Sequence, residues 1–101
     1  MLYFIIFGVI KGSMKIWYLY IVRCSDDTLY TGITTGLARR LNEHNTSKRG
    51  AKYTKARRPI NLVYYELYQS RSNAQKAEHK FKKLTRKQKE KKIATGGLNN
   101  D

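Results

Sequence analysis

Five side chains in this sequence have types and spacing that suit chemistry at a phosphate: Tyr20, Tyr30, Arg40, His44 and Glu78. A phenol can donate or accept a proton, and an arginine can hold phosphate oxygens with its planar fork. A carboxylate is a ligand that hard divalent cations prefer. Two phenols on neighbouring strands, an arginine from the next helix and a later carboxylate could therefore converge on one phosphodiester.

Each charged member of this set also has an ordinary structural interpretation. Arg40 could snorkel or pair with an acid, and His44 could be a satisfied histidine at the edge of the core. Glu78 could be an i,i+4 partner of Lys82, a pair that contributes about 0.2–0.5 kcal/mol on a helix surface. The chemical interpretation therefore depends on the side chains meeting in space.

The two phenols fall in segments with strand character. Residues 16–24 are rich in aromatic and β-branched side chains, residues 25–27 (Ser-Asp-Asp) have turn chemistry, and residues 28–34 resume the strand pattern. We therefore predict a β-hairpin. Alternation places Tyr18, Tyr20 and Val22 on one face of the first strand. The opposite face is also apolar, which favours a sheet with helices packed on both sides.

A helix is predicted from residue 35 to about residue 46, with Thr34 or Thr35 as its N-cap. At about 100° per residue, Arg40 and His44 fall in the same arc as Leu37 and Leu41. Both polar side chains therefore accompany the side of the helix that faces the core. An arginine in that position must find an anion or reach the edge of the core, because an unpaired buried guanidinium is costly.

Three further elements complete the predicted fold. Residues 60–68 read as a third strand, and a capping spacing that begins at Ser72 opens a helix with an apolar stripe. Glu78 lies at the margin of that stripe, and His79 projects to the polar side. The same spacing at Thr85 opens a short basic helix to about Ala94. The expected class is α+β, with a small, mainly antiparallel three-stranded sheet flanked by helices in the order β-β-α-β-α-α.

The segment from residue 47 to residue 59 has no apolar periodicity, and we expect an exposed loop that contacts nucleic acid. Its cations can follow a phosphate backbone, and its tyrosine offers a ring on which a base could stack. The alternative is a solvated loop whose tyrosine closes over the core. The candidate nucleic-acid-binding residues are Lys48, Arg49, Lys52, Tyr53, Lys55, Arg57 and Arg58.

Composition independently indicates an acidic partner. The 101 residues contain 21 Lys and Arg against 7 Asp and Glu, a formal charge of +14. Such a balance is typical of nucleic-acid binding, in which neutralised phosphates release their counterions. A generic basic surface, a ribosome-associated protein and a membrane-adsorbed protein are the alternatives. Mixed signs would be expected of a surface that serves solubility alone.

Length and cysteine content limit the organisation of the chain. About a hundred residues support one hydrophobic core, and we expect a single domain over residues 14–95 with a flexible tail at 96–101. The lone Cys24 suggests a small buried side chain in a reducing, cytoplasmic compartment. With no cluster of Cys and His at ligand spacing, zinc is not expected.

Residues 1–13 form an apolar extension that precedes a second methionine, Met14. The apolar run is too short for a membrane span, which needs about 20 residues, and it lacks clear features of a signal peptide. We expect translation to begin at Met14 and no stable membrane association. A weak membrane tether is the alternative.

From Lys15 to Ile93, the chain resembles the GIY-YIG nuclease family. Residues 18–20 (Tyr-Leu-Tyr) and 30–32 (Tyr-Thr-Gly) stand where that family has its two triplets, and Arg40, His44 and Glu78 fall at the spacings of its arginine, its helix histidine or tyrosine, and its metal-binding glutamate. The first triplet lacks glycine and isoleucine, and Thr31 replaces the isoleucine of the second. The chain is most similar to small stand-alone bacterial members of the YhbQ/YazA kind, which resemble the nuclease modules of DNA repair and homing endonucleases.

The resemblance implies an endonuclease that hydrolyses phosphodiesters, with DNA favoured over RNA, using a single Mg²⁺ or Mn²⁺. Glu78 would hold the cation, and Tyr30 would accept a proton from the attacking water. Arg40 would hold the phosphate, while Tyr20 and His44 orient the water or the phosphate. A non-catalytic DNA- or RNA-binding module with the same fold is the alternative, and such a module would tolerate loss of Glu78.

Overall fold

The computed structural model of the chain describes residues 15–96. The predicted order of elements is confirmed, with one short helix added inside the expected loop. The elements are β1 (Trp17–Arg23), β2 (Leu29–Thr34), α1 (Leu37–Thr46), α2 (Lys52–Lys55), β3 (Asn61–Tyr68), α3 (Arg71–Lys82) and α4 (Arg86–Gly96).

The three strands form one antiparallel sheet in the order β2-β1-β3, so β1 is the central strand. In the register, Tyr20 lies opposite Gly32 on β2 and Tyr65 on β3. The pairing of β1 with β3 shifts between Ile21 and Val22. The hairpin that carries both phenols is thus confirmed, and its turn positions them on adjacent strands.

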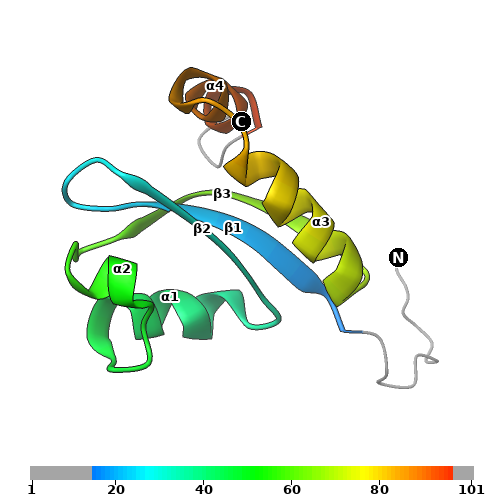
Figure 1. The fold of residues 1–101 in the computed structure, drawn as a ribbon. Coiled ribbons are helices and arrows are strands. Elements are labelled where there is room, and N and C mark those ends of the chain that lie inside the picture. Colours follow the sequence, from blue (N-terminus) through cyan, green and yellow to red (C-terminus); the bar gives the residue numbers. More distant parts are fainter. Residues whose placement is uncertain (1–14, 97–101) are drawn as a thin grey trace.

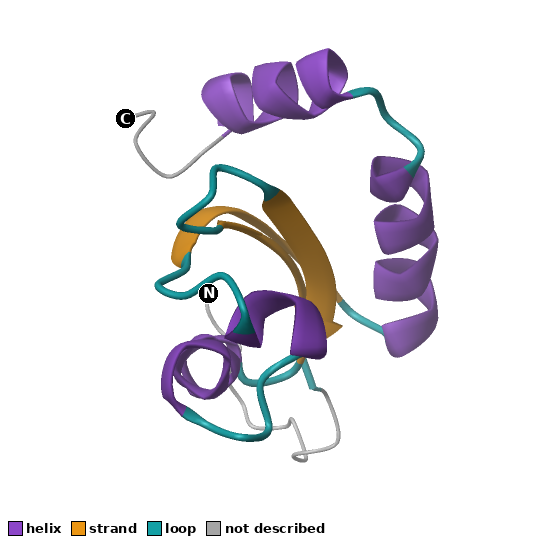
Figure 2. Ribbon diagram, turned by 60° about the vertical axis from the view of Figure 1, so that its left-hand side comes forward, coloured by secondary structure: helices purple, strands orange, loops and turns teal. Residues whose placement is uncertain are grey.

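Helices cover both faces of the sheet, as the two apolar faces of β1 predicted. Figure 1 shows α1 and α2 on one side of the strands and α3 and α4 on the other, and Figure 2 shows the same separation from a second direction. One core cluster contains Tyr20 and Val22 with Leu37 and Leu41 of α1 packed against it. The cluster on the opposite face is built from Ile21, Tyr64, Phe81 and Ile93.

The last helix is fixed to the sheet by an ion-pair network. Glu90 of α4 accepts hydrogen bonds from Arg23 of β1 at 2.7 and 2.8 Å and from Arg86 at 2.8 Å. Hydrogen bonding from Arg23 lowers the pKa of the Glu90 carboxyl to about 2. The capping box predicted at Thr85 is confirmed, because Gln88 N–H donates to Thr85 Oγ1 and Thr85 N–H donates to Gln88 Oε1.

The other two predicted N-caps are wrong. The cap of α3 is Ser70, whose hydroxyl accepts from the backbone N–H of Asn73 at 3.1 Å, and Ser72 lies inside the first turn. The helix begins this early because the same spacing of serine and polar side chain occurs two residues sooner, directly after β3. The cap of α1 is Gly36, while Thr34 stays in β2 and accepts from the Gly36 N–H at 3.1 Å.

Two aromatic contacts link β1 and β3 to the helices on the α3 side. The guanidinium of Arg71, the first residue of α3, lies 5.7 Å from the ring centre of Trp17. On β3, the carboxylate of Glu66 accepts hydrogen bonds from the hydroxyls of Tyr64 and Tyr68. The first contact joins α3 to β1. Glu66 also lies 3.7 Å from the ammonium of Lys92, which joins β3 to α4.

Cys24 is buried and unpaired, as expected of a small core side chain. No helix within residues 15–96 has the length and apolar character needed to cross a bilayer. The apolar extension at 1–13 lies outside the described residues.

Candidate active site

The ring of Tyr20 lies directly over Gly32, and this contact explains why a glycine occupies that position. A methyl group added to Gly32 would lie 2.5 Å from the hydroxyl oxygen of Tyr20 and 2.7 Å from the ring carbon that bears it. Only glycine permits so close an approach of a side chain to the backbone. Tyr20 therefore crosses from β1 over β2 and brings its hydroxyl toward the β2 edge of the sheet.

His44 lies behind Tyr20 and not on the surface of the site. Its side chain is fully buried, and its Nε2 is 2.7 Å from the Tyr20 hydroxyl. Its Nδ1 is 2.9 Å from the hydroxyl of Thr54 and accepts from the backbone N–H of Ala51 at 3.2 Å. Burial first, and then the nearby charge of Arg40, lower the pKa of His44 from 6.5 to about 4. The ring is therefore neutral at neutral pH and can affect chemistry only through Tyr20.

Tyr20 itself is a protonated phenol at neutral pH. Burial, then the proximity of Tyr30, raises its pKa to about 12. Hydrogen bonding from Arg40 acts in the opposite direction, and the charge of Glu78 adds to the rise. Besides burial, these influences come from one other phenol, Tyr30, and from the two charged candidates, Arg40 and Glu78. Since its side chain is only 1% exposed, Tyr20 suits a hydrogen-bond donor better than a base.

Tyr30 is the more accessible phenol, and it is held by neighbouring rings. Its ring lies 5.4 Å from that of His44, edge to face, and 5.9 Å from the ring of Tyr53, nearly parallel. The guanidinium of Arg57 lies 3.8 Å from the ring centre of Tyr53. Because Tyr30 and Arg57 contact this ring, Tyr53 supports Tyr30 within the folded chain, and a stacked base would have to displace one of its partners.

Arg40 projects from α1 toward the phenols and is braced by the chain. Its Nη1 donates to Glu43 and to the backbone carbonyl of Arg49, both at 2.8 Å. These contacts leave its Nε and Nη2 donors for Tyr20 and for a substrate oxygen. The pKa of the Glu43 carboxyl is lowered chiefly by its hydrogen bond with Arg40. The arginine is thus oriented by an ion pair with Glu43, as its structural alternative predicted.

Glu78 lies on the helix that covers the opposite side of the sheet from α1. It belongs to α3, which packs against β1 and β2, and its charge raises the pKa of Tyr20. Its carboxylate pairs with Lys82 at 3.1 Å, as the structural alternative predicted. The carboxylate side chain is 22% exposed, and a hollow of about 240 Å³ opens beside it. The carboxylate therefore pairs with Lys82 while its charge also acts on Tyr20.

The donor set fits a hard divalent cation that keeps most of its water. Within residues 15–96, no three His, Cys, Asp or Glu side chains are grouped closely enough to enclose a metal ion. Glu78 would be the one protein ligand, with water and phosphate oxygens completing the shell. Mg²⁺ commonly binds through one or two carboxylates and substrate phosphates, and so it suits a partly exposed carboxylate of this kind.

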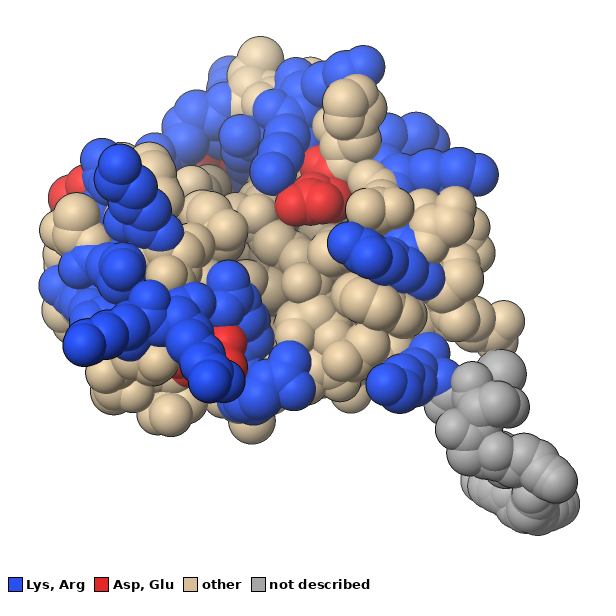
Figure 3. Space-filling model, turned by 60° about the horizontal axis from the view of Figure 1, so that its bottom comes forward, with Lys and Arg blue, Asp and Glu red and all other residues tan. Residues whose placement is uncertain are grey.

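The basic segment beside the site divides into free and engaged cations. Lys48, Arg49, Lys52 and Lys55 are exposed. Arg57 donates to Asp26 at 3.0 Å, and Arg58 donates to the carbonyls of His44 and Ser47 at the end of α1, both at 2.6 Å. Figure 3 shows Lys and Arg side chains gathered around a hollowed area of other residues. The four exposed cations can meet a phosphate backbone, although the ammonium of Lys55 also donates to the carbonyl of Lys48 at 3.3 Å, whereas Arg58 serves the fold.

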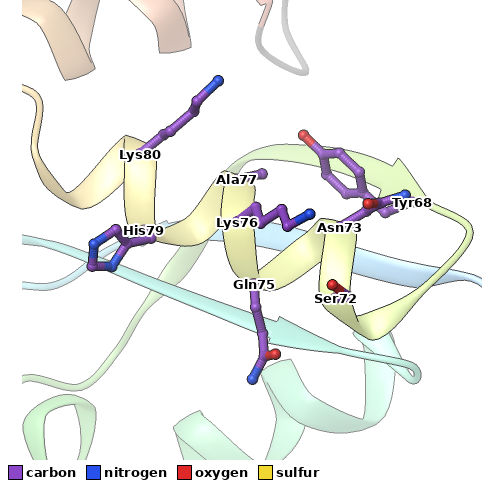
Figure 4. A pocket seen from close by; sticks show the side chains of 8 residues that line it. All are labelled: Tyr68, Ser72, Asn73, Gln75, Lys76, Ala77, His79 and Lys80. Atoms are coloured by element: carbon purple, nitrogen blue, oxygen red, sulfur yellow. The ribbon is translucent and has the colours of Figure 1, made fainter.

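A larger hollow lies elsewhere on the molecule and contains none of the five predicted site residues. It has a volume of about 910 Å³ and runs along α3 and the end of β3. Figure 4 shows its lining, in which side chains of α3 point in several directions around the helix and Tyr68 approaches from β3. Tyr20 and His44 are instead buried in the core beside Tyr30, so the type of side chain identifies the cluster better than cavity volume does.

Two contributors to the site gave no recognisable signal in the sequence. Thr54 is fully buried against His44, and the backbone N–H of Ala51 contacts the same ring. Both fall in a segment without apolar periodicity, and a backbone donor has no sequence signature. The role of Gly32 was implied by the triplet, but the ring that it accommodates could be identified only from the fold.

A family model described as the GIY-YIG catalytic domain matches residues 16–92. Curated relatives include the UPF0213 protein DP2720 of Desulfotalea psychrophila, 56% identical over 69 residues that cover 68% of this chain and 63% of that protein. The UPF0213 protein SAG0778 of Streptococcus agalactiae is 56% identical over 72 residues, covering 71% and 81%. The chain thus spans a little under two thirds of the first relative and most of the second.

Two solved structures share the fold. The UPF0213 protein BH0048 from Bacillus halodurans, determined by solution NMR, matches with a TM-score of 0.55 and 38% identity over 84% of this chain and 90% of that one. The NMR structure of the protein EF2693 from E. faecalis matches with a TM-score of 0.57 and 47% identity, covering 80% and 85%.

Proposed function

Because the chain belongs to the GIY-YIG family of nucleases, we propose that it is a divalent-cation-dependent endonuclease that hydrolyses phosphodiester bonds of DNA. The observation that carries the proposal is that both phenols meet at His44: the Tyr20 hydroxyl lies 2.7 Å from its Nε2, and the Tyr30 ring lies 5.4 Å from its ring. Arg40 and Glu78 support the proposal because both influence the pKa of Tyr20. Lys and Arg side chains gather around a hollowed face of the molecule (Figure 3).

The two phenols take different roles because their surroundings differ. Tyr30 is the more accessible, and it accepts a proton from the attacking water. Tyr20, whose pKa is raised to about 12, donates a hydrogen bond. Arg40 directs its free donors at a nonbridging phosphate oxygen, where charge builds up in the transition state. His44 is fully buried and orients Tyr20.

Glu78 holds Mg²⁺ or Mn²⁺ once Lys82, whose side chain is 55% exposed, moves away from the carboxylate. The bound cation supplies charge neutralisation at the phosphate and stabilises the departing oxyanion. The exposed cations Lys48, Arg49, Lys52 and Lys55 bind the flanking backbone without reading sequence. We therefore expect little base specificity from this chain alone.

Nicking of supercoiled or branched DNA with Mg²⁺ or Mn²⁺ tests the proposal. We compare the wild type with Tyr30→Phe and Glu78→Ala, and we measure binding of the same DNA by gel shift. Glu78→Ala should abolish cleavage while leaving binding nearly intact, because removing the carboxylate also removes a repulsion toward phosphate. Equal residual nicking in all three proteins would indicate contamination and favour the non-catalytic binding module.

A further inference from the structure

The short helix α2 contacts Tyr30 directly and Tyr20 through His44, from consecutive residues. The ring of Tyr53 lies nearly parallel to that of Tyr30 at 5.9 Å, and the hydroxyl of Thr54 lies 2.9 Å from Nδ1 of His44, which in turn bonds Tyr20. Thr54 is fully buried, so its hydroxyl has no contact with solvent that could substitute for the histidine. An element that was expected to be an exposed loop therefore packs behind the reactive groups.

The hydrogen-bond partners of His44 determine which of its ring nitrogens carries the proton. The backbone N–H of Ala51 points at Nδ1 from 3.2 Å, and a backbone amide can only donate. Nδ1 must therefore accept, and in a neutral imidazole the proton then resides on Nε2. The other tautomer would set two N–H hydrogens against each other. In the Nε2–H tautomer the Thr54 hydroxyl directs its hydrogen to Nδ1 at 2.9 Å and shares it with the carbonyl of Ala51, also at 2.9 Å.

This tautomer decides what the Tyr20 hydroxyl can do. With the proton on Nε2, His44 donates to the Tyr20 oxygen across 2.7 Å, and Tyr20 keeps its own hydrogen. Within residues 15–96, the other group that hydrogen-bonds Tyr20 is Arg40, which can only donate. The Tyr20 O–H therefore has no acceptor among the described residues. The guanidinium of Arg40 directs its own donors to the same edge of the sheet.

The Tyr30 ring is restrained by the same helix through a chain of contacts. Asp26 in the hairpin turn accepts from Arg57 at 3.0 Å, and Arg57 lies over the Tyr53 ring at 3.8 Å. Tyr53 in turn stacks beside Tyr30. The β1–β2 turn and α2 thus hold Tyr30 between them.

We propose that α2 is the positioning element of the site: through Ala51 and Thr54 it holds His44 as the Nε2–H tautomer, which turns the Tyr20 proton toward a phosphate oxygen, and through Tyr53 it orients Tyr30. His44, Tyr53 and Thr54 are positioning residues and do not touch the substrate. The inference rests on the proposed nuclease function for the identity of the acceptor, whereas the tautomer can be tested without activity.

The first test is ¹⁵N NMR of the histidine rings in the full-length protein at neutral pH without nucleic acid. The chain has two histidines, and His79→Gln leaves only the His44 signals. We expect a proton on Nε2 and none on Nδ1. A proton on Nδ1 would overturn the inference, whatever the protein cleaves.

The second test measures turnover, KM, oligonucleotide binding and melting temperature for two matched pairs, Thr54→Val with Thr54→Ser, and Tyr53→Leu with Tyr53→Phe. Misplacement of a reacting group by about 1 Å can cost about a hundredfold in rate. We therefore expect Thr54→Val and Tyr53→Leu to lower kcat about tenfold to a hundredfold with KM and binding unchanged. Thr54→Ser and Tyr53→Phe should retain turnover because they keep the hydroxyl and the ring.

The outcomes separate this inference from the proposed function. A fall in melting temperature with unchanged kcat of the folded protein would make α2 merely structural and overturn the positioning role. If the wild type cleaves no DNA or RNA offered, the proposed function fails, and the ring NMR alone then decides: a proton on Nε2 supports the role of α2, and one on Nδ1 refutes it.

Discussion

Gly32 illustrates how a residue without a side chain can define a reactive site. Its missing Cβ leaves the space in which the end of the Tyr20 ring lies, so the glycine is required by its neighbour and not by an unusual turn. The hydroxyl of Tyr20 reaches the β2 edge because of that space. A small substitution at Gly32 should therefore affect chemistry more than folding.

We predict that Gly32→Ala lowers cleavage at least tenfold, because the added methyl group would lie 2.5 Å from the Tyr20 hydroxyl and must displace it. Gly36→Ala is the matched control. Its methyl group would meet the Arg39 guanidinium at 2.7 Å, but that side chain is 61% exposed and can move away. Comparable loss of turnover in both variants would contradict the role given to Gly32.

His44 makes the free energy of unfolding depend on pH between about 4 and 6.5. Its pKa is lowered from 6.5 to about 4 in the folded protein, so folding favours the neutral ring. The corresponding stability is complete above pH 6.5 and is lost as the pH falls through 6.5 toward 4. Urea unfolding of the wild type should show this decline, and His44→Gln should show a flatter dependence there. His79→Gln, which keeps the buried ring, should behave like the wild type.

The side chains proposed to react were predicted from the sequence and remain a prediction, whereas the residues that support them gave no signal in the sequence. Tyr20, Tyr30 and Arg40 have reactive groups at characteristic spacings, and a motif records such spacing. Thr54 acts through one buried hydroxyl that contacts a ring ten positions away. Such a contact depends on how the chain returns to the sheet, which the local pattern of residues does not encode.

At the scale of elements, α2 is the difference between the predicted and the observed fold. Four residues are too few for apolar periodicity or for a helix that is stable alone. The segment is instead held by side chains outside it, because Arg57 reaches Asp26 and Arg58 binds the carbonyls that end α1. The strands, α1 and α3 could be predicted from apolar side chains that repeat along the sequence. α4, whose one buried residue is Ile93, could be predicted from the capping box at Thr85.

The segment that contains α2 should also dominate binding to nucleic acid. Charge reversal at Lys52 and Lys55 is expected to weaken DNA binding and to flatten its dependence on salt, because each phosphate contact contributes about one unit to the slope. Lys87→Glu with Lys91→Glu on α4 makes the same change of charge on exposed residues away from the site. Titration at several salt concentrations measures both slopes. An unchanged slope after reversal at Lys52 and Lys55 would exclude the segment from the interface.

At the scale of the whole molecule, two apolar core clusters lie on opposite faces of the sheet, and the chain that encloses them is strongly positive. A formal charge of +14 on 101 residues destabilises the compact state by self-repulsion. The arrangement of layers followed from the alternation in β1, whereas the position of Glu78 relative to the phenols depends on how α3 crosses the sheet. No residue pattern specifies that crossing, and it had to be observed.

We predict that screening stabilises the free protein. Raising the ionic strength from about 0.01 M to about 0.15 M shortens the Debye length from roughly 30 Å to about 8 Å and should raise the melting temperature. A short DNA duplex at low salt should raise it as well, because a ligand that binds the folded state alone stabilises that state. Calorimetry with and without duplex checks both effects. A melting temperature that falls with added salt would mean that the surface ion pairs outweigh the repulsion.

The contact between Arg71 and Trp17 supplies an intrinsic optical reporter. Trp17 is the one tryptophan of the sequence, and it lies at the start of β1 against the first residue of α3. The emission of Trp17 therefore reports whether α3, the helix that carries Glu78, is packed against the strands. Loosening of that segment would expose the indole to water and shift its fluorescence to longer wavelength, so docking can be followed in real time without a label.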